Sequence, residues 1–142
     1  MAVTYDKVAT VSIEEGLRKH LDDEFQNVYI GHYRESGNES VRIILDGSSL
    51  IQKTNLFEER EFTVRIRYYF KTPNTTRNED KGIKDKMDKM RKHILDKQVN
   101  GTLWTDLSVD EIIYNAGIDD EDELTGVTIG EFGLTFINYN QF

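Results

Sequence analysis

Cysteine is absent from the 142-residue chain, and only one proline, Pro73, is present. Without thiols, the chain cannot form a disulfide, a zinc–thiolate site or a cysteine nucleophile. No apolar run is long enough to cross a membrane, and residues 1–11 lack the apolar stretch of a secretory signal. A chain of this length buries about two-thirds of its unfolded surface without covalent links. We therefore expect one cytoplasmic domain over residues 1–142, with a flexible N-terminus at about residues 1–10.

Catalytic motifs are also missing. The sequence contains no H-E-x-x-H pair for zinc, no glycine-rich phosphate loop and no G-x-S-x-G nucleophile elbow. The three histidines, His20, His32 and His93, are scattered along the chain. These absences predict that the protein is not an enzyme and that it has no catalytic residue, cofactor or metal.

Positive charge is missing from the last third of the chain. All 18 Lys and Arg residues lie within residues 1–97, together with 17 of the 26 Asp and Glu residues. Residues 98–142 carry the other 9 acids, so the whole net charge of -8 arises there. Such an asymmetry concerns partners and solubility rather than the fold.

Two segments, at residues 12–25 and about 80–98, have the apolar spacing of amphipathic helices. Their apolar residues are Ile13, Leu17, Leu21 and Phe25, then Ile83, Met87, Met90 and Ile94. Ser12 and Glu15 form a capping-box pattern at the start of the first segment. Asn100-Gly101 is expected to stop the second helix.

Alternating apolar residues predict strands elsewhere in the chain. The expected strands are residues 27–33, 41–45, 50–54, 61–71, 103–107, 111–115 and 127–139. Asp46-Gly47 predicts a tight hairpin turn at residues 46–49. The element order α-β-β-β-β-α-β-β-β indicates an α+β domain, with two main helices packed on an antiparallel or mixed sheet.

In the last expected strand, the apolar residues change from odd to even positions. They are Val127 and Ile129, followed by Phe132, Leu134 and Phe136. A change of face requires a bulge or a break, and Gly130 and Gly133 lie where it would fall. We expect this strand to serve two surfaces, one of them outside its own subunit.

The strand at residues 61–71 has an apolar face and a mostly cationic face. The cationic face consists of Arg65, Arg67, Tyr69 and Lys71. Two different complementary patches on one chain can make head-to-tail contacts that close into a ring. We therefore predict that these four residues, with Phe132 and Phe136, form a subunit interface. In the alternative, the arginines pair within the chain, with Glu61 or with acids of an adjacent strand.

Two further polar segments are candidates for contacts. The densest acidic cluster is Asp119, Asp120, Glu121, Asp122 and Glu123. It lacks the glycine of an EF-hand loop, so it is interpreted as a solvated loop or a charged partner contact rather than a metal site. The run around Pro73, at residues 72–82, predicts a long polar loop that is mobile.

The chain resembles the tail terminator proteins of long-tailed bacteriophages over about residues 12–139. The resemblance is one of size and element order, and small head–tail connector proteins of phage necks share much of it. It is carried by the "DGSS" hairpin and by the segments "REFTVRIRYYFKT", "IKDKMDKMRKHILDK", "LWTDLSVDEIIYNAG" and "VTIGEFGLTFINYN".

The resemblance implies a structural virion protein that assembles in the host cytoplasm as a hexameric ring at the end of the tail tube. The ring would stop tail growth and dock the head, while DNA passes through without specific binding. Its partners would be further copies of itself, the tube protein and neck proteins, with no membrane. The acids at residues 119–123 would face the channel or a subunit boundary. The loop residues that would dock the tube or neck are Pro73, Asn74, Thr75, Thr76 and Arg77.

Two other classes remain open besides another neck component. Residues 81–97 hold 7 basic and 3 acidic residues, which suits a nucleic-acid-binding module. The interleaved acids and the overall negative charge argue against that class. A small acidic module that binds a basic protein through residues 98–142 is the other alternative.

Overall fold

Five β-strands form one mixed sheet in the part of the chain that the structure describes. The computed structural model describes residues 7–31, 39–71, 77–115 and 127–141, and the side chains of residues 77–80 lie outside it. The strands are β1 (Val28–Ile30), β2 (Glu39–Lys53), β3 (Phe57–Lys71), β4 (Thr105–Ile113) and β5 (Val127–Gln141). They are ordered β1-β2-β3-β5-β4, with β1 parallel to β2 and the other neighbours antiparallel. The predicted α+β class is confirmed.

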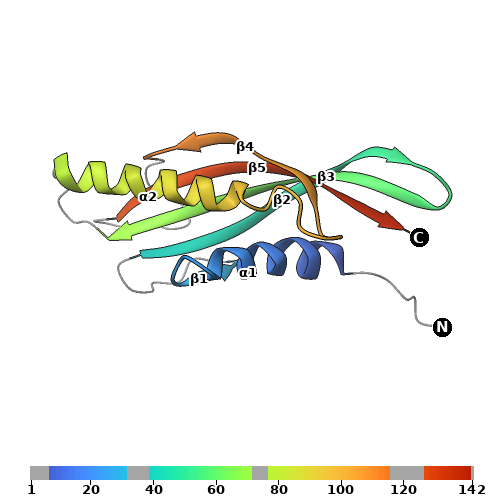
Figure 1. Ribbon diagram of the computed structural model, residues 1–142, viewed down its shortest axis with the longest axis horizontal. Helices are drawn as coiled ribbons and strands as arrows, with labels where there is room; N and C mark the ends of the chain where they lie inside the picture. The colour runs from blue at the N-terminus through green and yellow to red at the C-terminus, as the bar shows by residue number, and fades with distance from the viewer. Residues whose placement is uncertain (1–6, 32–38, 72–76, 116–126, 142) are drawn as a thin grey trace.

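Helices cover one face of this sheet (Figure 1). The first begins as a π-helix, η1 (Val8–Glu15), and continues as α1 (Gly16–Asp22), and the second is α2 (Arg77–Leu95). α1 and α2 are in contact, because the rings of His20 and His93 stack with centroids 4.2 Å apart. Residues 8–10 of the N-terminal segment are helical, and α2 includes residues 77–82, which were expected to belong to a loop.

The core lies between these helices and the sheet face that we call the inner face. β3 contributes the alternating residues Phe62, Val64, Ile66, Tyr68 and Phe70. The helical segments and the turn after α1 contribute Ile13, Leu17, Leu21, Phe25, Ile83, Met87, Met90 and Ile94. All of these residues are buried, so both predicted helix stripes and the predicted apolar face of β3 are confirmed.

The predicted hairpin turn at residues 46–49 is wrong. β2 runs through this segment and stays paired with β3, with register shifts after Leu45 and after Leu50. The chain reverses later, where Thr54 Oγ1 accepts hydrogen bonds from the backbone N–H groups of Leu56 and Phe57 at 3.1 and 3.2 Å. Bulges absorb the extra residues of β2, so the pairing with β3 continues past the local turn signal.

The predicted capping box is also wrong. Ser12 lies inside η1, which begins at Val8 with Lys7 as its N-cap and no capping side chain. Glu15 points instead to Arg18, with 2.9 Å between Oε2 and Nε. The helix extends further toward the N-terminus because Val8 packs against the core, which the capping pattern does not reveal.

Two boundaries near the C-terminal half differ from the prediction. α2 ends at Leu95, before the expected Asn100-Gly101 stop, although Gly101 does take a positive φ of 55° in the following turn. The strands expected at residues 103–107 and 111–115 are a single strand, β4, with two register shifts against β5. Those bulges allow one strand to carry both apolar runs.

The expected break in β5 is not present. β3 and β5 pair without a register shift along their whole length. Gly130 instead makes room for α2, since a Cβ built on it would lie 2.2 Å from Met87 Sδ. Ile129, beside Tyr69 on the opposite outer face, is itself only 1% exposed. The odd and even apolar positions therefore fill the two faces of one regular strand.

We expect Gly130→Val to lower the free energy of unfolding by about 1–3 kcal/mol, because the added carbons overlap the Met87 side chain. Gly47→Val is the matched control, because a Cβ at Gly47 meets no atom within 4 Å. Urea unfolding followed by circular dichroism measures both variants. An equal loss at both positions would contradict the packing role of Gly130.

His20 and His93 join α1 to α2 through a reciprocal pair of hydrogen bonds. His20 Nε2 donates to the His93 carbonyl at 2.7 Å, and His93 Nε2 donates to the His20 carbonyl at 2.6 Å. His20 is 2% exposed, and its Nδ1 has no hydrogen-bond partner among the described residues. Burial lowers the pKa of His20, and the nearby His93 and Lys97 lower it further. A proton on Nδ1 would therefore be buried without an acceptor.

We expect the stability of the protein to fall as the pH drops through 6.5. Below this pH the His20 side chain of the unfolded chain binds a proton, whereas burial keeps the same side chain neutral in the folded chain. Each proton that only the unfolded chain binds makes the free energy of unfolding fall by up to about 1.4 kcal/mol per pH unit. Urea unfolding between pH 7.5 and 5.5 measures this slope. His20→Gln should make the dependence of stability on pH less steep. Asp96 and Lys97, which lie near the pair, are unchanged in this variant. An unchanged slope in the variant would contradict the assignment to His20.

Candidate subunit interface

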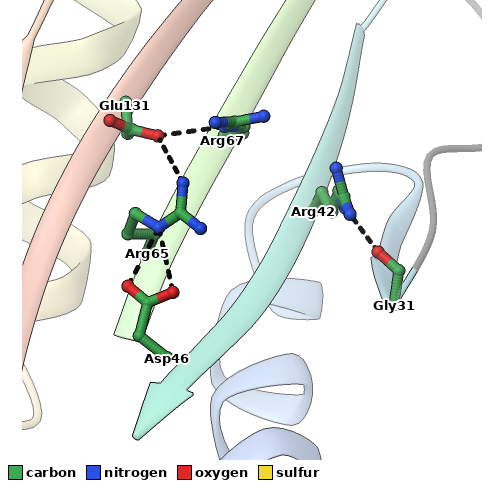
Figure 2. Close-up of polar contacts among 6 residues, drawn as sticks. All are labelled: Gly31, Arg42, Asp46, Arg65, Arg67 and Glu131. Carbon is green, nitrogen blue, oxygen red and sulfur yellow. Dashed lines mark hydrogen bonds and ion pairs between the residues drawn. The ribbon is translucent and has the colours of Figure 1, made fainter. Parts of the chain in front are cut away.

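Arginines and carboxylates form a continuous row on the outer face of the sheet (Figure 2). Arg65 Nε on β3 donates to both carboxylate oxygens of Asp46 on β2, at 3.1 and 2.9 Å. Glu131 on β5 lies 3.5 Å from Arg65 Nη1 and accepts a hydrogen bond from Arg67 Nε at 2.9 Å. The hydrogen bond to Asp46 raises the pKa of Arg65. This row contains two cations and two anions, so its charges balance.

Arg65 and Arg67, which were predicted to lie at a subunit interface, belong to this row. They pair with acids of adjacent strands, as the alternative prediction stated, but the partners are Asp46 and Glu131 rather than Glu61. Arg67 is 9% exposed, and next to it Arg42 is 6% exposed and donates from Nε to the Gly31 carbonyl (Figure 2). Of the two arginines, Arg65 has the more accessible side chain, with 37% of it exposed against 11% for Arg67. The cationic face is therefore mostly neutralised within the chain.

Three predicted interface aromatics are corrected to core residues. Phe132 and Phe136 are fully buried on the inner face, and Tyr69 is 2% exposed. Phe136 contacts Phe62 and Trp104, with ring centroids 6.4 and 5.5 Å away. A side chain that is fully covered by its own chain cannot contact a neighbour, so these three residues are removed from the interface.

The remaining predicted site residues lie at or beyond the limits of the described structure. Lys71 is half-buried at the end of β3. Arg77 is the first residue of α2, and its side chain is outside the described part. The docking-loop residues Pro73, Asn74, Thr75 and Thr76 and the acids Asp119, Asp120, Glu121, Asp122 and Glu123 all fall outside the described residues.

The structure adds a surface that the sequence reasoning missed, which we call the hairpin arm (residues 46–56). Figure 1 shows the β2–β3 hairpin continuing past the ends of the helices. Every residue of the arm is exposed, including Leu50 at 51%, Ile51 at 47% and Leu56 at 71%. The sequence did hold a signal, because "GSSLIQKTNLF" (47–57) contains apolar residues but only one charge.

A hollow of about 680 Å³, which we call the terminal hollow, lies at the end of β5, where residues 138–141 pair with residues 57–60 of β3. Its walls come from the start of η1 and the end of β5. The lining residues are Lys7, Val8, Val11, Ser12, Thr102, Asn138, Tyr139, Asn140 and Gln141. Lys7 is the one charged residue among the described residues of this lining, so the hollow, like the arm, is nearly uncharged and partly apolar.

A second hollow, of about 410 Å³, has a different character. It lies between the end of α1 and α2, and Glu24, Glu39, Lys86 and Lys89 supply four of its lining residues. These charges are paired, because Lys89 Nζ lies 3.6 Å from Glu24 and Lys86 contacts Glu39. Tyr68 also donates to Glu39 at 2.8 Å, and burial raises its pKa to about 12. The described residues of this hollow therefore offer no unpaired charge to a ligand.

Neither a metal centre nor a membrane-spanning helix is found in the described ranges. No group of three or more His, Asp or Glu side chains there is placed to hold a metal ion. None of the helices over the same residues combines the length and apolar character needed to cross a bilayer.

Comparison with known proteins gives no relative from which a function could be transferred. Neither the known protein families nor the curated proteins contain a match to this chain. The function must therefore be argued from the surfaces described above.

Proposed function

We propose that this chain is a structural, ring-forming subunit of a long-tailed bacteriophage that acts as the tail terminator. The observation that carries the proposal is the hairpin arm, whose exposed Leu50, Ile51 and Leu56 have no cover in a single chain. Exposed apolar surface on an extended hairpin marks a site of association. In this role the chain would close the tail tube and present the surface on which the head docks.

The charge pattern and the outer face also support a structural role. The row Asp46–Arg65–Glu131–Arg67 neutralises the arginines that a nucleic-acid-binding surface would need to keep free. The excess of acids in residues 98–142 suits a ring through which DNA slides, since like charges repel and prevent adhesion. The α+β fold with helices on one sheet face agrees with the architecture that the family resemblance implies.

Sedimentation velocity over a concentration series, with and without Mg²⁺, tests the ring directly. We expect a species of about six subunits at the highest concentrations, because a head-to-tail contact closes into a ring when its rotation allows. Negative-stain microscopy of the same sample should then show rings with a central hole. Monomers at every concentration would contradict the proposal.

Adding duplex DNA to the same samples separates the competing classes. A terminator subunit should show no sequence-independent binding, whereas a nucleic-acid-binding module would bind with an affinity that falls steeply with salt. Rings that do not bind DNA would support a role in the head–tail neck. Tight DNA binding by a monomer would favour the module instead.

A further inference from the structure

We propose that the hairpin arm of one copy docks in the terminal hollow of a second copy of this chain. The proposal deepens the ring-forming function and rests on it, because it names the two surfaces that meet at each subunit contact. On the arm, the contact residues are Leu50, Ile51 and Leu56. On the hollow, they are Val8, Val11 and the amides of Asn140 and Gln141.

One edge of the arm is an unpaired strand edge. β1 pairs only with residues 41–43 of β2, so the outer edge of β2 from Ile44 to Lys53 has no strand partner in the described structure. Unpaired N–H and C=O groups along such an edge are ready to accept a partner. Leu50 and Ile51 stand on this edge strand, and Leu56 follows at the turn. The arm therefore offers both hydrogen-bonding groups and apolar side chains.

The terminal hollow matches both features of the arm. Val8 and Val11 form an apolar wall, and Val11 is 54% exposed in the single chain. Asn140 and Gln141 supply amide groups on the other side, whereas the Asn138 amide is buried and donates to the Leu103 carbonyl at 2.8 Å. An amide both donates and accepts hydrogen bonds, so it can satisfy either group of a strand edge. A volume of about 680 Å³ lies within the range of pockets that enclose ligands.

The low charge of both the arm and the terminal hollow favours a second copy of this chain as the partner. The arm carries two charged residues, Lys53 and Asp46, and Asp46 is paired with Arg65, while the described lining of the hollow carries Lys7. A nearly uncharged arm fits a nearly uncharged hollow, whereas the 410 Å³ hollow is lined by four charged side chains. The arm does not reach the hollow of its own chain, because Leu50 is held in the ladder opposite Arg60 and stays 51% exposed.

Two other kinds of partner fit the arm less well. Nucleic acid requires several cations along its phosphates, and the arm carries one. A membrane surface is bound by apolar residues together with a cluster of Lys or Arg, which the arm lacks. The neutral, partly apolar surface of a second copy is therefore the best match, and the other partners become outcomes of the test.

The absence of native cysteine allows a clean cross-linking experiment with the full-length chain. Ile51→Cys and Val11→Cys are made separately, mixed and treated with a short bismaleimide, which links thiols without demanding disulfide geometry. We expect a cross-linked dimer from this mixture. Ile51→Cys mixed with Lys81→Cys, an exposed position on α2, is the matched control and should give little product. Equal yields in both mixtures, or no product in either, would overturn the proposal.

A substitution tests the same contact by affinity. Ile51→Asp should weaken self-association by about tenfold or more, because it places a charge in an apolar contact. Val99→Asp changes an aliphatic side chain that is 62% exposed outside both surfaces, so it should leave association unchanged. Unfolding curves of both variants should match the wild type, since both positions are exposed. Equal weakening by the two variants would contradict the docking.

The combined results separate this inference from the proposed ring. Rings without an arm-to-hollow cross-link would overturn the docking and leave the ring function standing. A cross-link within closed dimers alone would support the docking and contradict the ring. A cross-link that appears only with DNA or anionic vesicles present would assign the arm to those partners and overturn docking on a second copy.

Discussion

Phe136→Ala should lower the free energy of unfolding by about 3–5 kcal/mol, as expected when a fully buried aromatic ring is truncated. Phe136 is 0% exposed and lies against Phe62 and Trp104 between the sheet and the N-terminal helix. Its removal leaves a cavity that these rings can fill only in part. Urea unfolding at neutral pH measures this loss of stability.

Tyr139→Ala is the matched control on the same strand. Tyr139 stacks on Phe57 with ring centroids 4.8 Å apart, but it is 49% exposed, so its truncation should cost about 1 kcal/mol or less. If Phe136 were an interface residue, Phe136→Ala would weaken association while leaving the stability of the monomer almost unchanged. That result would restore the sequence-based interface prediction and contradict the core assignment.

The sequence predicted the features that depend on local periodicity. The apolar stripes of residues 13–25 and 83–94 and the inner face of β3 all follow from spacing, because burial on one side imposes a period of 3.6 or 2. The change of face in β5 was read correctly as two apolar sets, but wrongly as a break in the strand. Gly130 is required by Met87 of α2, a contact between segments that no local pattern encodes.

Register and long-range pairing explain the errors at the candidate site. Asp46-Gly47 has strong turn chemistry, yet β2 continues because β3 offers it a long strand partner. The partners of Arg65 and Arg67 come from β2 and β5, and the sequence alone does not reveal that β5 lies beside β3. The hairpin arm exists because the chain reverses at residues 54–56 rather than at residues 46–49. The proposed contact surface is therefore the hairpin arm rather than the aromatic residues.

Glu131→Ala should lower the free energy of unfolding by about 3 kcal/mol, because it removes the carboxylate from an arginine that is almost buried. The side chains of Arg67 and Glu131 are 11% and 16% exposed, so water cannot replace the lost partner fully. Raising the salt concentration should change the effect little, since buried pairs are screened less than exposed ones. Urea unfolding at low and high salt measures both expectations.

Glu15→Ala is the control, because Glu15 pairs with Arg18 at the same 2.9 Å but with 41% and 36% of the side chains exposed. Its effect should be too small to resolve, as is usual for surface pairs. A double-mutant cycle with Glu131→Leu and Arg67→Met then measures the pair itself. The double variant should lose less stability than the sum of the single variants, by about 1 kcal/mol or more. If the stability losses of the two single variants add up to that of the double variant, Arg67 and Glu131 do not stabilise each other. Arg67 would then again be a candidate for contact with a neighbouring subunit.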